Sequence, residues 1–237
     1  MKSSFGGFPP EALKFLRGLK KNNNRDWFEA NKQVYLDSVK APMEELVTAV
    51  SAAIARFAPA YVTDPKKAIF RIYRDTRFSP DKTPYKTHTG ALFGRADLPK
   101  NQGGAFYFHI SSNEVGIAGG VYSVGSDQLL ALRSHFAGNY EQFRKLTSSK
   151  GLVNAAGEIR GDRLARAPKG FAPDHPAIDL LRGKQWYFWR ELDPKTAEKP
   201  EVFGEVVSRF ERMLPVVEFL NVPLIALAKK NQRLRME

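Results

Sequence analysis

Three stretches between residues 87 and 122 constrain the fold most, because their apolar side chains recur with the period of two that is typical of β-strands. They run from Thr87 to Arg95, from Ala105 to Ser111 and from Val115 to Tyr122. The residues Ser112-Asn113-Glu114 predict a tight turn between the last two stretches. Connections this short favour antiparallel pairing, since parallel strands need crossovers of a dozen residues or more. We therefore expect an antiparallel sheet.

The regions on both sides of these strands follow the helical period of 3.6 residues. Before the sheet we expect a helix after Pro9-Pro10, a second one capped by Asp26, and a third from Pro42 to Phe57. After the sheet we expect a helix capped by Ser126, a short helix from Asp174-His175-Pro176, a long helix that ends or kinks at Pro215, and a further helix over Leu224–Lys230.

Further strands are predicted over Ile69–Arg74 and over the aromatic run Gln185–Arg190, and a small hairpin over Val153–Arg166. No internal repeat or linker divides the chain. The expected fold class is α+β, an antiparallel sheet flanked by N-terminal and C-terminal helices, in a single domain over residues 1–237.

The composition excludes several classes of protein. The chain has no cysteine, which excludes disulfides, thiolate metal sites and cysteine nucleophiles and fits a reducing compartment. The first ten residues lack the apolar core of a signal peptide, and no apolar run approaches the roughly 20 residues of a membrane span. We expect a cytoplasmic protein that is not inserted in a membrane.

Positive charge is concentrated in one short segment. The chain carries a formal charge of +12. Between Lys66 and Lys86, seven basic residues stand against two acidic ones, a net +5 in 21 residues. A field of this sign attracts phosphates, nucleic acids and other anions.

The segment from Arg71 to His88 is therefore the candidate site. If strand geometry continues past Tyr73, Arg71, Tyr73, Asp75 and Arg77 share one face. Guanidinium groups bind phosphate or carboxylate through two parallel hydrogen bonds, and lysines add point charges. The predicted ligand contacts are Arg71, Arg74, Arg77, Lys82 and Lys86. The alternative is that Asp75 and Asp81 pair with these arginines in a structural loop.

Proton transfer at such a site needs a titratable group. The candidates are Tyr73, Asp75, His88 and His109, of which the two histidines lie on neighbouring predicted strands. The chain has no His-x-His pattern, no phosphate loop, no dinucleotide-binding fingerprint and no serine elbow, so we predict no metal and no cofactor. Whether the protein is an enzyme stays open at this point.

Several motifs together resemble the domain of unknown function 2461 family, which occurs in bacteria and fungi. They are Asn24-Arg25-Asp26-Trp27-Phe28, Arg74-Asp75-Thr76-Arg77-Phe78-Ser79, Pro84-Tyr85-Lys86-Thr87-His88, Pro168-Lys169-Gly170-Phe171 and Asp174-His175-Pro176. The resemblance extends from about Phe8 to the last long helix, and it implies no activity.

The leading functional hypothesis is that the sheet and its arginine-rich loop bind a small phosphorylated or carboxylated ligand. A nucleic-acid-binding module is the first alternative, because of the basic segment and because the aromatic runs Phe106–Phe108 and Trp186–Trp189 offer rings for stacking, although core packing explains these rings better. A protein-interaction domain with an acidic partner is the second. The sequence does not determine the oligomeric state.

Overall fold

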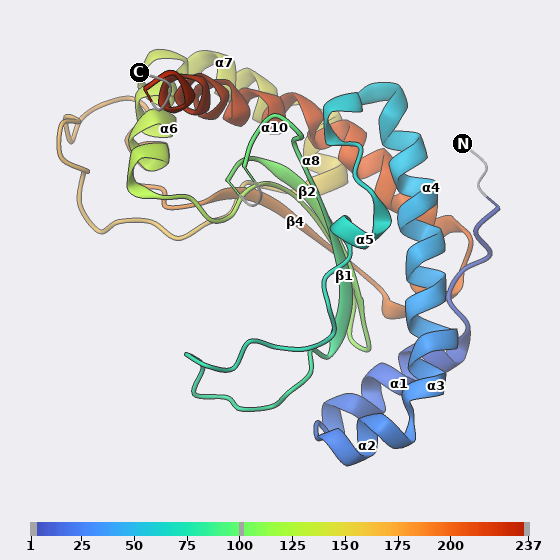
Figure 1. The fold of residues 1–237 in the computed structure, drawn as a ribbon. Coiled ribbons are helices and arrows are strands. Elements are labelled where there is room, and N and C mark those ends of the chain that lie inside the picture. Colours follow the sequence, from blue (N-terminus) through green and yellow to red (C-terminus); the bar gives the residue numbers. More distant parts are fainter. Residues whose placement is uncertain (1–3, 100–101, 235–237) are drawn as a thin grey trace. The chain divides into compact units, whose positions relative to one another are not determined.

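A computed structural model describes residues 4–99 and 102–234 of the chain (Figure 1). Its elements in chain order are the helices α1 (Pro10–Lys21), α2 (Arg25–Ala30) and α3 (Lys32–Val34), the π-helix η1 (Tyr35–Lys40), α4 (Ala41–Phe57), the 3-10 helix η2 (Pro59–Tyr61), α5 (Pro65–Ala68), the strands β1 (His88–Gly94), β2 (Ala105–Ser111) and β3 (Val115–Val121), the helices α6 (Ser126–Gly138), α7 (Tyr140–Thr147), α8 (Lys150–Ala156) and α9 (Ile178–Leu181), the strand β4 (Trp186–Leu192), the 3-10 helix η3 (Pro194–Glu198) and the helix α10 (Glu201–Arg233).

The fold is α+β, as predicted. Its four strands form one antiparallel sheet in the order β1-β2-β3-β4, with helices before it and a long helix after it. Ser111 N–H donates to the Glu114 carbonyl at 3.0 Å and closes the predicted turn between β2 and β3.

The described residues form two compact units. The first contains residues 4–93, 107–117 and 191–208, and the second contains the remainder. All four strands have residues in both units, β1 only through its last residue, Gly94. The expectation of one domain over residues 1–237 stays a prediction.

Strand β2 shows how the period of two positions the site. Phe106, Phe108 and Ile110 are fully buried on one face, because alternate residues of a strand point to the same side. Tyr107 and His109 lie on the other face, where Tyr107 is half-buried and His109 is 8% exposed. This face of the first unit carries polar side chains.

Two predicted helix caps are wrong. Helix α2 is capped by Asn24, whose side chain accepts a hydrogen bond from Trp27 N–H at 2.9 Å, so Asp26 lies inside the first turn. Ser126 is the first residue of α6, and Gly125 N–H instead donates to the Gln128 side-chain oxygen at 2.8 Å. In both cases a side chain two positions from the predicted cap accepts the hydrogen bond at the helix terminus.

At Pro215 the sequence predicts an end or a kink of the helix. The end is wrong, since α10 continues through Pro215 and Pro223 to include the predicted helix over Leu224–Lys230, and the kink stays a prediction. Proline inside a helix costs about 3 kcal/mol. One side of α10 is fully buried at Val206, Phe210, Met213, Val217 and Leu220. Burial of each such side chain contributes roughly 1.5 to 3 kcal/mol, which outweighs the cost of the prolines.

Three further predictions need correction. The segment Ile69–Arg74 forms only the isolated bridges Ile69↔Ala91 and Tyr73↔Tyr85. Residues 153–166 contain the end of α8 and two isolated bridges, not a hairpin. The short helix expected from Asp174 begins later, at Ile178. In the second of these segments Gly157 and Gly161 have φ of +74° and +145°, which lie outside strand geometry.

Among the described residues, no helix has the length and apolar content needed to cross a bilayer.

Candidate functional site

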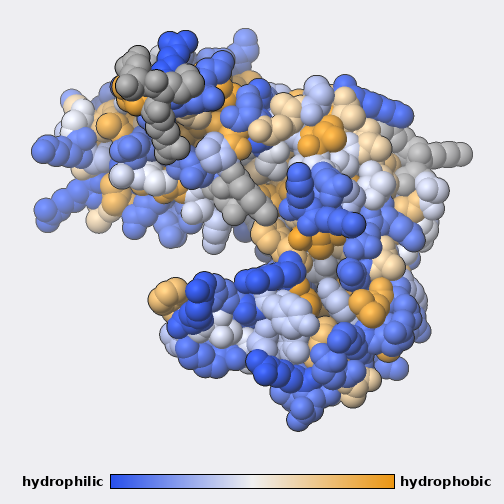
Figure 2. All heavy atoms as spheres, in the orientation of Figure 1, coloured by the Kyte–Doolittle hydropathy of each residue, from blue (hydrophilic) through white to orange (hydrophobic). Residues whose placement is uncertain are grey.

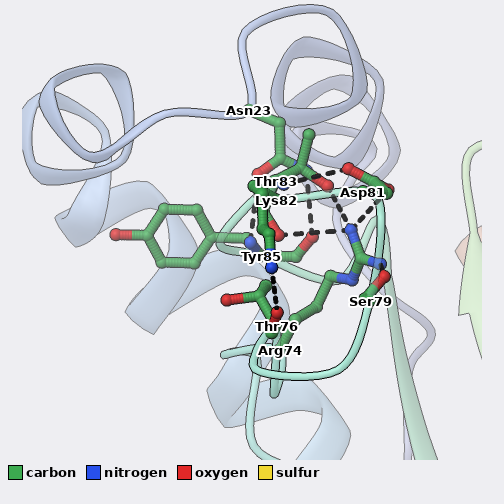
Figure 3. Close-up of polar contacts among 8 residues, drawn as sticks. All are labelled: Asn23, Arg74, Thr76, Ser79, Asp81, Lys82, Thr83 and Tyr85. Carbon is green, nitrogen blue, oxygen red and sulfur yellow. Dashed lines mark hydrogen bonds and ion pairs between the residues drawn. The ribbon is translucent and has the colours of Figure 1, made fainter.

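The loop between Arg71 and Thr87, drawn in teal at the lower end of β1 in Figure 1, is attached to the turn between α1 and α2. Asn23 Nδ2 donates to the Tyr85 carbonyl at 2.9 Å, and Tyr85 N–H donates to Asn23 Oδ1 at 3.0 Å (Figure 3). The rings of Phe28 and Tyr85 stack with centroids 4.1 Å apart. The Asn23 side-chain amide thus forms with the Tyr85 backbone the pair of hydrogen bonds that an adjacent β-strand would form.

Arg74 holds the two limbs of this loop together (Figure 3). Its Nη1 donates to Asp81 Oδ2 at 2.5 Å and also to the side-chain and backbone oxygens of Thr83. Hydrogen bonds from Thr83 to Asp81, together with the Arg74 guanidinium, lower the pKa of the Asp81 carboxyl to about 2. Arg74 is therefore a structural residue of the loop, whether or not it also contacts a ligand.

Arg77 and Lys82 also have partners within the loop. Arg77 binds Asp75 through two parallel hydrogen bonds, Nη2 to Oδ2 at 2.8 Å and Nε to Oδ1 at 3.0 Å. The hydrogen bond from the Arg77 side chain lowers the pKa of Asp75 to about 2. Lys82 Nζ donates to the Thr76 carbonyl at 2.9 Å. The structure thus shows the acid–arginine pairs that the sequence left as an alternative.

The predicted shared face of Arg71, Tyr73, Asp75 and Arg77 does not form, because regular strand geometry is absent after Tyr73. Tyr73 instead contributes its ring to an aromatic cluster, 5.4 Å from the ring of Tyr85. Figure 2, drawn in the orientation of Figure 1, shows that the surface around this loop is mainly hydrophilic.

Lys86 and Arg71 lie where the loop joins β1. Lys86 Nζ donates to the Arg71 carbonyl at 2.6 Å and lies 5.7 Å from the centre of the Phe70 ring. Burial, together with the charge of Arg71, lowers the pKa of the Lys86 ammonium. The Arg71 side chain is exposed, and among residues 4–99 and 102–234 it has no ion-pair partner.

The two predicted histidines meet on the polar face of the sheet. The rings of His88 on β1 and His109 on β2 have centroids 5.0 Å apart. Burial and the charge of Lys86 lower the pKa of His88. Burial and the neighbouring His88 lower the pKa of His109 to about 4. Both imidazoles are therefore neutral at pH 7.

Two residues that sequence reasoning missed complete this group. Glu114 Oε1 lies 3.2 Å from His109 Nε2, and the Tyr107 hydroxyl lies 3.2 Å from His109 Nδ1. Burial and the nearby Glu191 raise the pKa of the Glu114 carboxyl. The alternation of β2 places Tyr107 beside His109, and the tight turn at Ser112 returns Glu114 to the same strand end. Both signals were present in the sequence.

The site has a basic end and an acidic end. Arg71, Lys86 and His88 form the basic end, while Glu114 and Glu191 form the acidic end, with His109 between them. In the described part of the chain, no three His, Asp or Glu side chains are grouped to hold a metal ion. The chemistry available is anion binding by the basic end and proton transfer through His109.

A hollow of about 880 Å³ lies in the second unit, lined by Ala96–Pro99, Ser123–Gln128 and the end of α10. Its carboxylate Asp97 is paired with Arg95 at 2.8 Å. Among the described residues that line this hollow there is no histidine beside a carboxylate, as there is on the sheet face. We therefore place the candidate site on the polar face of the sheet in the first unit.

The model of a family described as conserved hypothetical protein, DUF2461, matches residues 11–219. No curated protein and no solved structure matched the chain.

Proposed function

The chain belongs to the DUF2461 family of conserved hypothetical proteins, and we propose that it binds a small phosphate- or carboxylate-bearing anion at the basic end of the polar sheet face. Arg71, Lys86 and His88 supply the contacts. The ligand class follows from their chemistry, because guanidinium and ammonium groups donate charge-assisted hydrogen bonds to such oxygens.

One observation supports this proposal above the others. Burial and the charge of Arg71 lower the pKa of Lys86, and burial and the charge of Lys86 lower the pKa of His88, so positive charges on these groups repel one another. No carboxylate among the described residues lies within ion-pair distance of any of the three. An anion bound between them would relieve this repulsion, since opposite charges favour the charged forms of lysine and histidine.

The loop supports the basic end by holding its backbone in place. Arg74 joins Asp81 and Thr83, and Asn23 joins the loop to the turn between α1 and α2. A rigid loop loses little entropy when a ligand binds. Arg77 contributes to binding only if a ligand displaces Asp75 from its guanidinium group. Ligand contacts of Arg74, Arg77 and Lys82 stay a prediction.

Thermal unfolding with inorganic phosphate, pyrophosphate, nucleotides, sugar phosphates and dicarboxylates tests the proposal. A ligand at about 100 times its Kd adds about 2.7 kcal/mol of stability, which raises Tm by roughly 5 to 10 °C for a chain of this length. We expect this shift to disappear in Arg71→Ala and Lys86→Met.

Arg144→Ala is the matched control, because Arg144 is an exposed arginine that pairs with Glu141 on α7. It removes the same charge and should keep the full shift. The proposal fails if no compound in the panel raises Tm, or if Arg71→Ala and Arg144→Ala respond alike. The ligand-dependent shift in Tm of Arg77→Ala shows whether Arg77, at the end of the loop, contributes to ligand binding.

A specific observation also favours single-stranded nucleic acid as a second candidate ligand. Phe78 is 93% exposed, and the Arg77 guanidinium lies 5.8 Å from the centre of its ring. An exposed ring beside cations is the usual platform for base stacking, worth about 1 to 3 kcal/mol per base. Phe78→Ala should therefore weaken binding of a labelled oligonucleotide by about fivefold or more. Absence of binding at about 50 mM salt excludes this candidate.

A further inference from the structure

The two compact units share the positive charge of the chain unequally. Residues 4–93, 107–117 and 191–208 of the first unit contain 17 basic and 15 acidic residues, a net +2. The remaining described residues, which form the second unit, contain 17 basic and 9 acidic residues, a net +8. The basic end of the polar sheet face lies in the first unit. The larger charge excess therefore belongs to the second unit, and a field of this sign attracts polyanions.

The segment between α8 and β4, drawn in yellow to orange in Figure 1, pairs with the edge of β4 that faces away from β3. Arg160 N–H donates to the Tyr187 carbonyl at 2.7 Å, and Tyr187 N–H donates to the Arg160 carbonyl at 3.1 Å. Just before β4, Lys184 N–H donates to the Asp162 carbonyl at 2.8 Å. Residues directly opposite each other in an antiparallel pair have Cβ atoms about 5 Å apart. The side chains of Arg160 and Tyr187 are therefore neighbours on one face.

This segment and β4 carry exposed cations. Between residues 157 and 190, seven basic residues stand against four acidic ones. Six of the seven are exposed, namely Arg160, Arg163, Arg166, Lys169, Lys184 and Arg190. Within the described ranges of the chain, none of these six forms an ion pair. Because the protein does not neutralise these charges, they are available to the oxygens of an anionic partner.

The aromatic run at the start of β4 divides between the two faces of the sheet. Trp186 and Phe188 are 2% and 1% exposed, so they belong to the core. Tyr187 and Trp189 point to the other side, because side chains alternate along a strand, and both are half-buried. Core packing thus explains only two of the four rings.

Tyr122, directly after β3, extends the outer row of rings. Its ring centroid lies 5.3 Å from that of Tyr187, with 67° between the ring planes. Gly120 lets β3 approach β4 closely here, since a Cβ atom at Gly120 would lie 2.6 Å from Tyr187 Cα. Edge-to-face packing accounts for the contact between the two tyrosines, but Tyr122 is still 65% exposed. Tyr122, Tyr187 and Arg160 form a row across three adjacent segments of the chain.

We propose that this row, the stacking surface made of Tyr122, Tyr187 and Arg160, binds single-stranded nucleic acid. The two tyrosine rings stack on bases, and Arg160 with the neighbouring exposed cations contacts phosphates. Such binding tolerates many sequences, because every base has a π-face. The stacking surface lies in the second unit, whereas the basic end of the sheet face and Phe78 both lie in the first. It is therefore a site in addition to the proposed function.

The chemistry of the stacking surface favours an unpaired polynucleotide over other polyanions. An acidic protein would engage the cations but would leave the tyrosine rings without aromatic partners. A duplex keeps the faces of its bases inside its own stack, whereas the bases of a single strand are free to stack on side chains. Single-stranded RNA and DNA share this chemistry, and the experiment below separates them.

Fluorescence anisotropy with labelled oligo(dT) and oligo(U) of about 20 nucleotides at about 50 mM salt tests the proposal. We expect binding of both single strands and weaker binding of a duplex of the same length. The tighter of the two single strands identifies DNA or RNA as the preferred ligand. Tyr122→Ala should weaken binding at least about fivefold, the loss expected for one stacked base. Tyr122→Phe keeps the ring and should bind as the wild type does.

Arg160→Ala tests the phosphate contact. It should weaken binding and reduce the slope of log K against log salt by about 0.7, the value for one phosphate contact of a single strand. Arg144→Ala is the matched control in the same unit, because Arg144 is exposed but pairs with Glu141 at 3.6 Å. It should keep the affinity and the slope. Ultraviolet cross-linking of the bound oligonucleotide, mapped by mass spectrometry, should label Tyr122 or Tyr187.

The proposal is overturned if neither single strand binds at about 50 mM salt, or if a duplex binds as tightly. It is also overturned if Tyr122→Ala and Arg160→Ala bind as Arg144→Ala does. Polyglutamate that competes as well as unlabelled oligonucleotide would indicate an acidic protein partner instead. Cross-links confined to Phe78 would support the candidate in the first unit and overturn the stacking surface. The anion site is judged separately, by a thermal shift that depends on Arg71 and not on Arg160.

Discussion

Acidification should destabilise the protein through His109. Its pKa is about 4 in the folded chain, lowered by burial and by His88, against 6.5 for the ordinary side chain. Between these two values the unfolded chain binds a proton that the folded chain does not. The free energy of unfolding therefore rises with pH in this window, and the contribution of His109 is complete above about pH 6.5 and lost as the pH falls toward 4.

The magnitude follows from the two pKa values. The full shift corresponds to about 3 kcal/mol. Lowering the pH from 7 to 5 removes about 2 kcal/mol of it, because the unfolded histidine is almost fully protonated at pH 5 and the folded one is still mostly neutral. His109 is only 8% exposed, so solvent screens this effect weakly.

Urea unfolding of wild type and His109→Gln at pH 7 and at pH 5 gives the free energy of unfolding that each protein loses between these two pH values. The difference between the two losses measures the effect of His109. The wild type should lose about 2 kcal/mol more than the variant over this range. The pKa values of His88 and His135 are lowered as well. The contribution of His135 cancels because both proteins contain it, whereas part of the measured difference belongs to the coupling of His109 with His88. Equal losses in the two proteins would refute a neutral, buried His109.

Three further variants test the packing of each unit. Asn221→Ala should lower the free energy of unfolding by about 2 to 4 kcal/mol, because the fully buried Asn221 amide binds both the N–H and the carbonyl of Gly104. A loss below about 0.5 kcal/mol in urea unfolding would contradict this. Gly120→Ala should strongly reduce the yield of folded protein, because its φ is +137° and a Cβ would lie 2.3 Å from a backbone oxygen; a wild-type Tm would be the contrary result. Arg74→Ala should speed tryptic cleavage of the loop, whereas Arg77→Ala should not. The reason is that the Arg74 side chain is only 25% exposed, whereas the Arg77 side chain is 77% exposed. Equal cleavage rates in the two variants would show that Arg74 does not order the loop.

Local pattern was sufficient for most elements. Four of the predicted strands, the aromatic strand Gln185–Arg190 included, and the turn at Ser112 are confirmed within a residue or two, because side-chain alternation depends only on neighbours along the chain. Pro215 shows where local rules fail. A proline is a helix breaker in isolation, but the buried side of α10 outweighs that cost through contacts distant in sequence.

The candidate site shows the same division. The concentration of positive charge between Lys66 and Lys86 and the pairing of His88 with His109 could be read from the residues. The sequence did not show which of these charges neutralise one another. Arg74 and Arg77 pair with the two acids of the loop, Asp81 and Asp75. Among the described residues this leaves Arg71, Lys82 and Lys86 of the predicted ligand contacts without a carboxylate partner.

The sequence by itself thus determined the α+β class, the antiparallel strands and the segment that carries the charge, because these depend on periodicity and composition. Only the tertiary structure decided that Asn23 anchors the loop and that Gly90 makes room for the Tyr107 hydroxyl beside His109. These contacts join residues from separate elements, and hydrogen-bond geometry and steric room exist only once those elements are packed.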